Sequence, residues 1–147
     1  MPRCMSFSMT TEAVRNHTKT VTRRVGWDFL KPGDLLWACE KCQGLKKGEK
    51  VKRLTLIRVV SKRLESLSEL ERLSLAEQVL EMRREGFPGI TVPEFLSAYL
   101  RASKLPDAMW PVNRIEFEYA EEKVARRLSG VEPNSSLDRE RGDHEPV

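Results

Sequence analysis

Lys19-Thr20-Val21-Thr22-Arg23-Arg24 is the stretch that indicates both the fold and a possible site. Alternate side chains of an extended segment share a face, so Thr22 and Lys19 point to opposite sides of a regular strand. A twist or bulge at the start of the strand would bring both side chains to one cleft. A desolvated lysine can take the proton of a threonine hydroxyl and make it a nucleophile. The residues fit equally an exposed edge strand whose hydroxyls and cations face water.

On either side of this stretch, the pattern of apolar residues and turn signals predicts a small α+β domain. Lys31-Pro32-Gly33-Asp34 is a turn signal that opens a strand, and Thr91-Val92-Pro93-Glu94 is a capping box that opens a helix. The expected strands are 7–9, 35–39, 54–61 and 115–119, and the expected helices are 12–16, 70–82 and one that begins after Thr91. We expect the strands to enclose a barrel-like core with the helices outside.

Length and composition limit the class of protein. The chain has 147 residues, 39% hydrophobic and 33% charged, with a formal charge of +4, which suits one globular domain. We expect a domain over residues 1–120 and a polar, disordered tail over 121–147, where glycine, proline, serine and charged residues dominate. No apolar run approaches the roughly 20 residues of a membrane span, so no membrane partner is expected. Three cysteines and the absence of a secretory signal favour the cytoplasm.

Basic residues gather in two places, around the 19–24 stretch and over residues 46–63. The second cluster includes Lys46, Lys47 and Lys50 in a loop rich in glycine and lysine. Such clusters form either a solvated surface or a groove for phosphate groups. Trp27, beside the first cluster, is a candidate for stacking on a base.

Cys39-Glu40-Lys41-Cys42 is a lone pair of cysteines at the spacing that zinc sites use. Zinc needs four ligands, and the remaining candidates are only Cys4, His17 and His144. We therefore interpret the cysteines as structural and expect no metal and no cofactor.

The ordered stretches described above resemble the ASCH domain, a relative of the PUA domain. The matching residues are His17 to Arg24, Phe29 to Asp34 and the closing Ile115-Glu116-Phe117, so that the resemblance covers about residues 5–120. The loop over 45–50 looks like the subset carried by phages and prophages. The resemblance implies a small PUA-like β-barrel with flanking helices and a cleft that handles RNA, DNA or a nucleobase.

The resemblance also implies two kinds of activity. Some members hydrolyse N4-acylcytidine with a lysine, a threonine and a glutamate, and the matching positions here are Lys19, Thr22 and Glu85. Lys19 would act as base and Thr22 as nucleophile, while Glu85, from sequence alone most simply a solvated acid, would position or shuttle the proton. Other members are ribonucleases or bind nucleic acid.

The main expectation is thus a protein that binds nucleic acid or a modified nucleoside in a basic cleft. The alternatives are an N4-acetylcytidine amidohydrolase and a ribonuclease. The residues expected to contact the nucleic acid or substrate are Thr20, Arg23, Arg24, Trp27, Lys46, Lys47 and Lys50.

Overall fold

The computed structural model describes residues 2–42 and 45–120. In chain order its elements are β1 (Arg3–Ser6), α1 (Thr11–Arg15), β2 (Val21–Arg24), β3 (Leu35–Cys39), β4 (Arg53–Ser66), the 3₁₀ helix η1 (Leu67–Arg72), α2 (Leu75–Arg84), α3 (Val92–Ser103) and β5 (Pro111–Tyr119). The expected tail, 121–147, lies outside the described residues.

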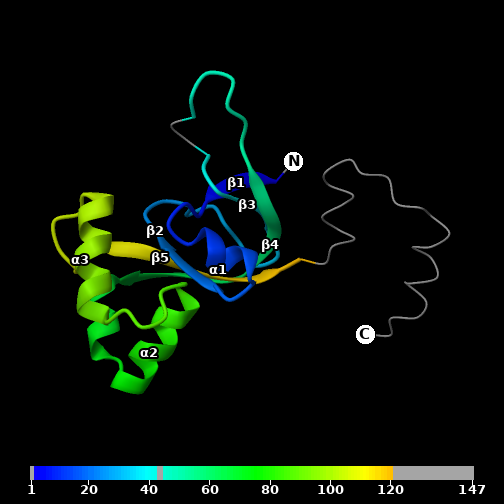
Figure 1. The fold of residues 1–147 in the computed structure, drawn as a ribbon. Coiled ribbons are helices and arrows are strands. Elements are labelled where there is room, and N and C mark those ends of the chain that lie inside the picture. Colours follow the sequence, from blue (N-terminus) through cyan, green and yellow to red (C-terminus); the bar gives the residue numbers. More distant parts are fainter. Residues whose placement is uncertain (1, 43–44, 121–147) are drawn as a thin grey trace, which may run out of the picture.

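The five strands form one sheet in the order β1-β3-β4-β5-β2, which curls into a half-barrel (Figure 1). Only the pair β1–β3 is parallel; the other three pairs are antiparallel. The long strand β4 pairs with both β3 and β5, and its register shifts between Val59 and Ser61. Such a bulge increases the twist and bends the strand, which helps the sheet to curl. The expected α+β fold, a small barrel with flanking helices, is confirmed, with the sheet curled into a half-barrel.

Two apolar clusters stabilise this arrangement. One fills the curl of the sheet and includes Met5 of β1, Phe7 and, from α1, Val14. The other joins η1, α2 and α3, with Leu67, Leu70, Met82, Phe95 and Leu96 among its buried members. The helices α2 and α3 pack together beside β2 (Figure 1), so a part of β2 faces helices instead of solvent.

Two predicted elements are wrong. The first strand is Arg3–Ser6 and not 7–9, because residues 3–6 pair in parallel with β3 and Phe7 then turns into the core. The predicted helix over 70–82 is divided: η1 ends at Arg72, and α2 begins after Ser74, whose side chain caps it. Thr91 and Glu94 form the predicted capping box at the start of α3.

No helix in the ranges that the structure describes has both the length and the apolar composition to cross a membrane.

We propose that the domain ends near residue 120. Among the described residues the buried apolar side chains run from Met5 to Phe117, and β5 ends at Tyr119. Deleting Ser129–Val147 should therefore leave the thermal midpoint within a few degrees of the wild-type value. Circular dichroism on heating measures this, and a truncated chain that fails to fold would contradict the boundary.

Candidate active site

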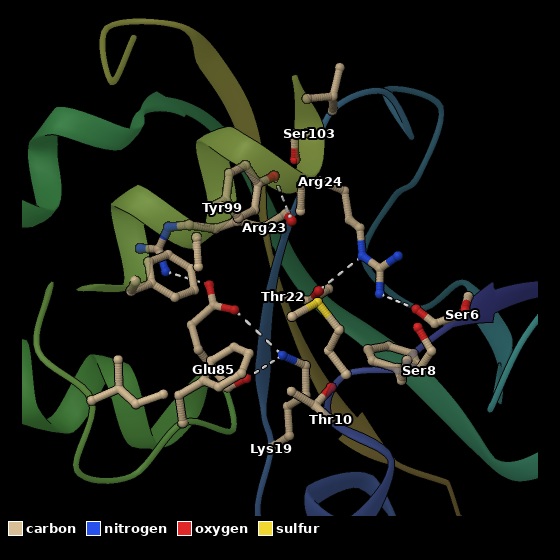
Figure 2. Close-up of a pocket in the computed structure, with 18 of the residues that line it drawn as sticks. Ser6, Ser8, Thr10, Lys19, Thr22, Arg23, Arg24, Glu85, Tyr99 and Ser103 are labelled. Carbon is tan, nitrogen blue, oxygen red and sulfur yellow. Dashed lines mark hydrogen bonds and ion pairs between the residues drawn. The ribbon is translucent and has the colours of Figure 1, made fainter. Parts of the chain in front are cut away.

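A pocket of about 730 Å³ lies between β2, the segment that follows β1, the end of α2 and the inner face of α3 (Figure 2). Five residues singled out from the sequence line it, namely Lys19, Thr22, Arg23, Arg24 and Glu85. Its volume is within the range of pockets that hold small molecules. The structure thus brings together residues more than 60 positions apart.

The start of β2 is fixed by two hydrogen bonds from β5. The hydroxyl of Tyr119 donates to the carbonyl of Lys19 (2.6 Å), and Phe117 N donates to the carbonyl of Thr20 (2.9 Å). Val21, Thr22 and Arg23 are all buried, although successive residues point to opposite faces of β2. The alternation of side chains along β2 therefore does not distinguish a solvent-exposed face from a buried one.

Lys19 is the central cation of the pocket. Its side chain is 3% exposed, and its ammonium donates to the backbone carbonyl of Glu85 and lies 3.4 Å from Glu85 Oε1 (Figure 2). Burial lowers the pKa of Lys19 to about 8, although the charge of Glu85 opposes the shift. A lysine of this kind exchanges its proton near neutral pH.

Glu85 is buried, not solvated, because the end of α2 packs against residues 10–13. Gly86 makes this approach possible: its φ is +92°, and an added Cβ would come within 3.1 Å of Thr10 and 3.2 Å of Ala13. A glycine at this position is a local signal for a helix end. Nothing local in the sequence shows that this end packs beside β2.

A buried network of charges holds Glu85 in place. Arg23 donates to Glu85 Oε2 (2.7 Å), to Glu81 Oε2 (2.6 Å) and to Glu65 Oε1 (2.9 Å). Arg114 donates to the same Glu81 carboxylate from β5 (2.7 Å). Arg23 was expected to contact a ligand; it lines the pocket, and three carboxylates already engage its guanidinium. Sequence reasoning missed Glu81, whose spacing of four residues from Glu85 puts both on one helix face.

Thr22 presents its hydroxyl to the pocket beside Arg24. Arg24 Nε donates to Thr22 Oγ1 (3.0 Å), and another nitrogen of the same guanidinium donates to the carbonyl of Ser6 (Figure 2). Within the described part of the chain, no hydrogen bond joins Lys19 Nζ to Thr22 Oγ1. The nearby cation favours an ionised oxygen at Thr22 over a neutral one.

An aromatic wall faces these polar groups. Phe87, Phe95 and Tyr99 line the pocket. The ring centres of Phe87 and Phe95 are 5.8 Å apart, and those of Phe95 and Tyr99 are 5.7 Å apart. Tyr99 also donates its hydroxyl to the carbonyl of Arg23 (2.8 Å). The spacing of Phe95 and Tyr99 on one face of α3 was the available signal, and it indicated only a core-facing helix.

The other predicted contact residues do not line this pocket. Thr20 is half-buried, and its backbone bonds to Arg84 and Phe117. Trp27 packs against the sheet core beside Phe29. The lysines of the β3–β4 loop, Lys46, Lys47 and Lys50, are exposed on a segment that projects away from the domain (Figure 1).

Residues that could hold a metal lie elsewhere. The sulfur atoms of Cys4, Cys39 and Cys42 are within 4.8 Å of one another. In the sequence only Cys39 and Cys42 are close together. The parallel pairing of β1 with β3 brings Cys4 to them.

Comparisons with known proteins support the fold. No family model matches the chain, and no curated protein matches it. Among solved structures, an ASCH domain from Lactobacillus crispatus is similar with a TM-score of 0.54 and 10% identity, over 80% of this chain and 78% of that one. A hypothetical protein gives 0.54 and 19% identity over 82% of this chain and 100% of the other.

A third structure, a protein from Enterococcus faecalis, gives a TM-score of 0.51 and 14% identity over 82% of this chain and 76% of that chain. Identities this low are evidence of fold alone. The chain has an ASCH-like fold, as the sequence predicted, while the relation to the PUA domain and the resemblance to a phage-type subset stay predictions.

Proposed function

We propose that the pocket binds a modified nucleoside and hydrolyses an acyl group from its exocyclic amine, N4-acetylcytidine being the substrate that the resemblance to ASCH proteins implies. The observation that carries the proposal is the buried pair Lys19–Glu85 in a pocket that also presents the Thr22 hydroxyl. These are the residue types that amide hydrolysis needs: a base, a nucleophile and a group that holds the base.

The chemistry would proceed in two steps. Neutral Lys19 takes the proton of Thr22 while Oγ1 attacks the acyl carbonyl carbon, and the charge of Arg24 stabilises the developing oxyanion. The C–N bond then breaks, the leaving amine takes the proton from Lys19, and an acyl ester remains on Thr22. Water, deprotonated by Lys19, then attacks the ester carbonyl carbon. The bond from that carbon to Thr22 Oγ1 breaks, Oγ1 takes the proton back from Lys19, and acetate leaves. Because Lys19 contacts Glu85 in the free protein, its Nζ must turn toward Thr22, as the neutral amine, when substrate binds.

The pocket also suits a nucleoside in size and lining. Its volume, about 730 Å³, accommodates a base with its ribose. A flat base can lie against Phe87 or Tyr99, since aromatic rings stack on any base. Ser6, Ser8 and Thr10 on the opposite side supply groups that hydrogen-bond to ribose hydroxyls.

The first test is the pH dependence of N4-acetylcytidine hydrolysis by the wild type. An ammonium cannot accept a proton, so kcat/KM should rise as the pH passes through about 8 and level off above it. In Glu85→Gln the midpoint should move to lower pH, because the carboxylate charge that raises the pKa of Lys19 is gone. Release of cytidine, followed by chromatography, measures both. A pH-independent rate, or no turnover at all, would contradict the enzyme proposal.

A second function, binding of nucleic acid, is favoured by a different observation. Lys46, Lys47 and Lys50 are exposed together on the projecting β3–β4 loop, and no side-chain ion pair engages them among the residues described. A lone nucleoside carries no phosphates, so these charges suit a longer chain. We propose that the loop contacts the phosphate backbone of an RNA or DNA that carries the modified base.

This proposal predicts a salt-dependent affinity for a short oligonucleotide. Replacing Lys46, Lys47 and Lys50 with alanine should reduce the slope of log K against log salt by up to about three contacts. The matched control replaces the exposed Arg72, Arg83 and Arg101, which removes the same charge elsewhere. Fluorescence anisotropy at several salt concentrations measures the slopes. Equal effects of the two triple variants would mean that only net charge matters.

A further inference from the structure

Three thiols meet on the outer face of the half-barrel, away from the pocket lining. Cys4 is on β1, Cys39 ends β3, and Cys42 follows in the next loop. In the parallel pair β1–β3, Cys4 lies opposite Trp37 and Ser6 opposite Cys39. Residues two apart share a face, so Cys4 and Cys39 point to the same side. Only two residues separate Cys42 from Cys39, and its sulfur lies close to the other two.

We propose that these three cysteines bind one thiophilic metal ion, Zn²⁺ or Cu⁺, through three thiolates. Their sulfur atoms lie within 4.8 Å of one another. Ligands about 2.3 Å from a tetrahedral zinc ion are about 3.8 Å apart, so small rotations of the side chains close the site. Thiolates select Zn²⁺ and Cu⁺ over harder cations.

The number of ligands explains why either ion is possible. The cluster holds no fourth cysteine, histidine, aspartate or glutamate among the described residues. Cu⁺ is satisfied by three thiolates, whereas Zn²⁺ would take its fourth ligand from solvent, as zinc does in open sites. In the sequence only Cys39 and Cys42 are neighbours, because the pairing of β1 with β3 is what brings Cys4 to them.

The surroundings of the cluster suit an anionic metal–thiolate centre. Cys39 is buried in an apolar cluster with Trp37 and Leu56, which limits competition from water. Arg53 pairs with Cys39 across the strands, and its guanidinium lies 4.5 Å from the centre of the Trp37 ring. Directly paired residues of neighbouring strands point to the same side, so this cation would offset part of the negative charge of three thiolates. Cys4 and Cys42 are half-buried, so an ion can enter from their side.

Titration of the full chain, reduced and kept free of oxygen, tests the proposal. Zn²⁺ and Cu⁺ are added in separate arms, each in competition with a chromophoric chelator, and the ion bound more tightly identifies the metal. We expect one ion per chain and a higher thermal midpoint with the ion bound. Cys4→Ser and Cys42→Ser should each weaken binding by about 100-fold or more, because each removes a ligand.

The matched control is Lys41→Ala, which changes an exposed residue between Cys39 and Cys42 and keeps every thiol. It should bind the ion as the wild type does. Circular dichroism checks that the serine variants fold; both replace half-buried residues and leave Cys39 in the core. Absence of a one-to-one complex with either ion would overturn the proposal. A complex that both Cys4→Ser and Cys42→Ser still form would also overturn it. A protein that binds neither ion when reduced, and forms a Cys39–Cys42 disulfide in air, would do the same.

Discussion

Thr22→Val is expected to lower the turnover of N4-acetylcytidine by about 10³-fold or more, because valine keeps the branched shape and removes the attacking oxygen. Lys19→Met should give a loss of similar size, since the hydroxyl is unreactive without its base. The double variant should be little worse than either single one, because a nucleophile and its base act as a unit. Steady-state rates of cytidine release from the three variants measure these losses.

Two further variants distinguish chemistry from structure. Thr22→Ser should keep part of the activity, because the hydroxyl remains while its rotamer is less restrained. Thr20→Ala is the matched control: it lies two residues away, outside the pocket lining, and should turn over substrate as the wild type does. Equal losses in Thr20→Ala and Thr22→Val would show that the segment is structural. If Lys19→Met weakened only oligonucleotide binding, Lys19 would be a phosphate or base contact.

The largest expected effect on stability is that of Glu81→Gln. Glu81 is 3% exposed and accepts hydrogen bonds from Arg23 and Arg114, which come from two strands. The glutamine keeps the shape but leaves two buried guanidinium groups short of a counter-charge. Breaking a buried pair in this way costs about 3–5 kcal/mol of the free energy of unfolding. Urea unfolding, followed by circular dichroism, measures the loss.

Glu77→Gln is the control, because Glu77 lies on the same helix and is exposed. It should change the free energy of unfolding by no more than about 0.5 kcal/mol. If Glu81→Gln were equally mild, Glu65 and Glu85 alone would satisfy Arg23.

The wild type and Glu81→Gln also allow a test of this network by its pH dependence. Burial raises the pKa of Glu81, but the hydrogen bond from Arg114 and the charge of Arg23 outweigh it and lower the pKa to about 2 from 4.5. A lowered pKa in the folded state means that the stabilisation is present above pH 4.5 and is lost as the pH falls toward 2. The difference in stability between wild type and Glu81→Gln should therefore shrink over that range. A constant difference would contradict the role of the Glu81 charge.

Local signals in the sequence determined several elements correctly. The capping box at Thr91 fixes the start of α3 because its two hydrogen bonds join residues three apart. The strand over 35–39 is as predicted, with Trp37 and Cys39 buried. Apolar residues at helical spacing predicted one helix over 70–82, which is wrong. Three of these apolar residues, Leu73, Val79 and Leu80, are exposed in the structure.

The sequence by itself also indicated two of the residues that line the pocket. Lys19 and Thr22 are close in the chain, and their residue types indicated a base and a nucleophile before any fold was known. Only the tertiary structure decided that Glu85 joins Lys19, 66 positions away, and that Cys4 joins Cys39 and Cys42. The physical reason is the same in both cases. A glutamate at a helix end and a cysteine in an edge strand carry no local signal of their partner, because packing of α2 on β2 and pairing of β1 with β3 create that contact.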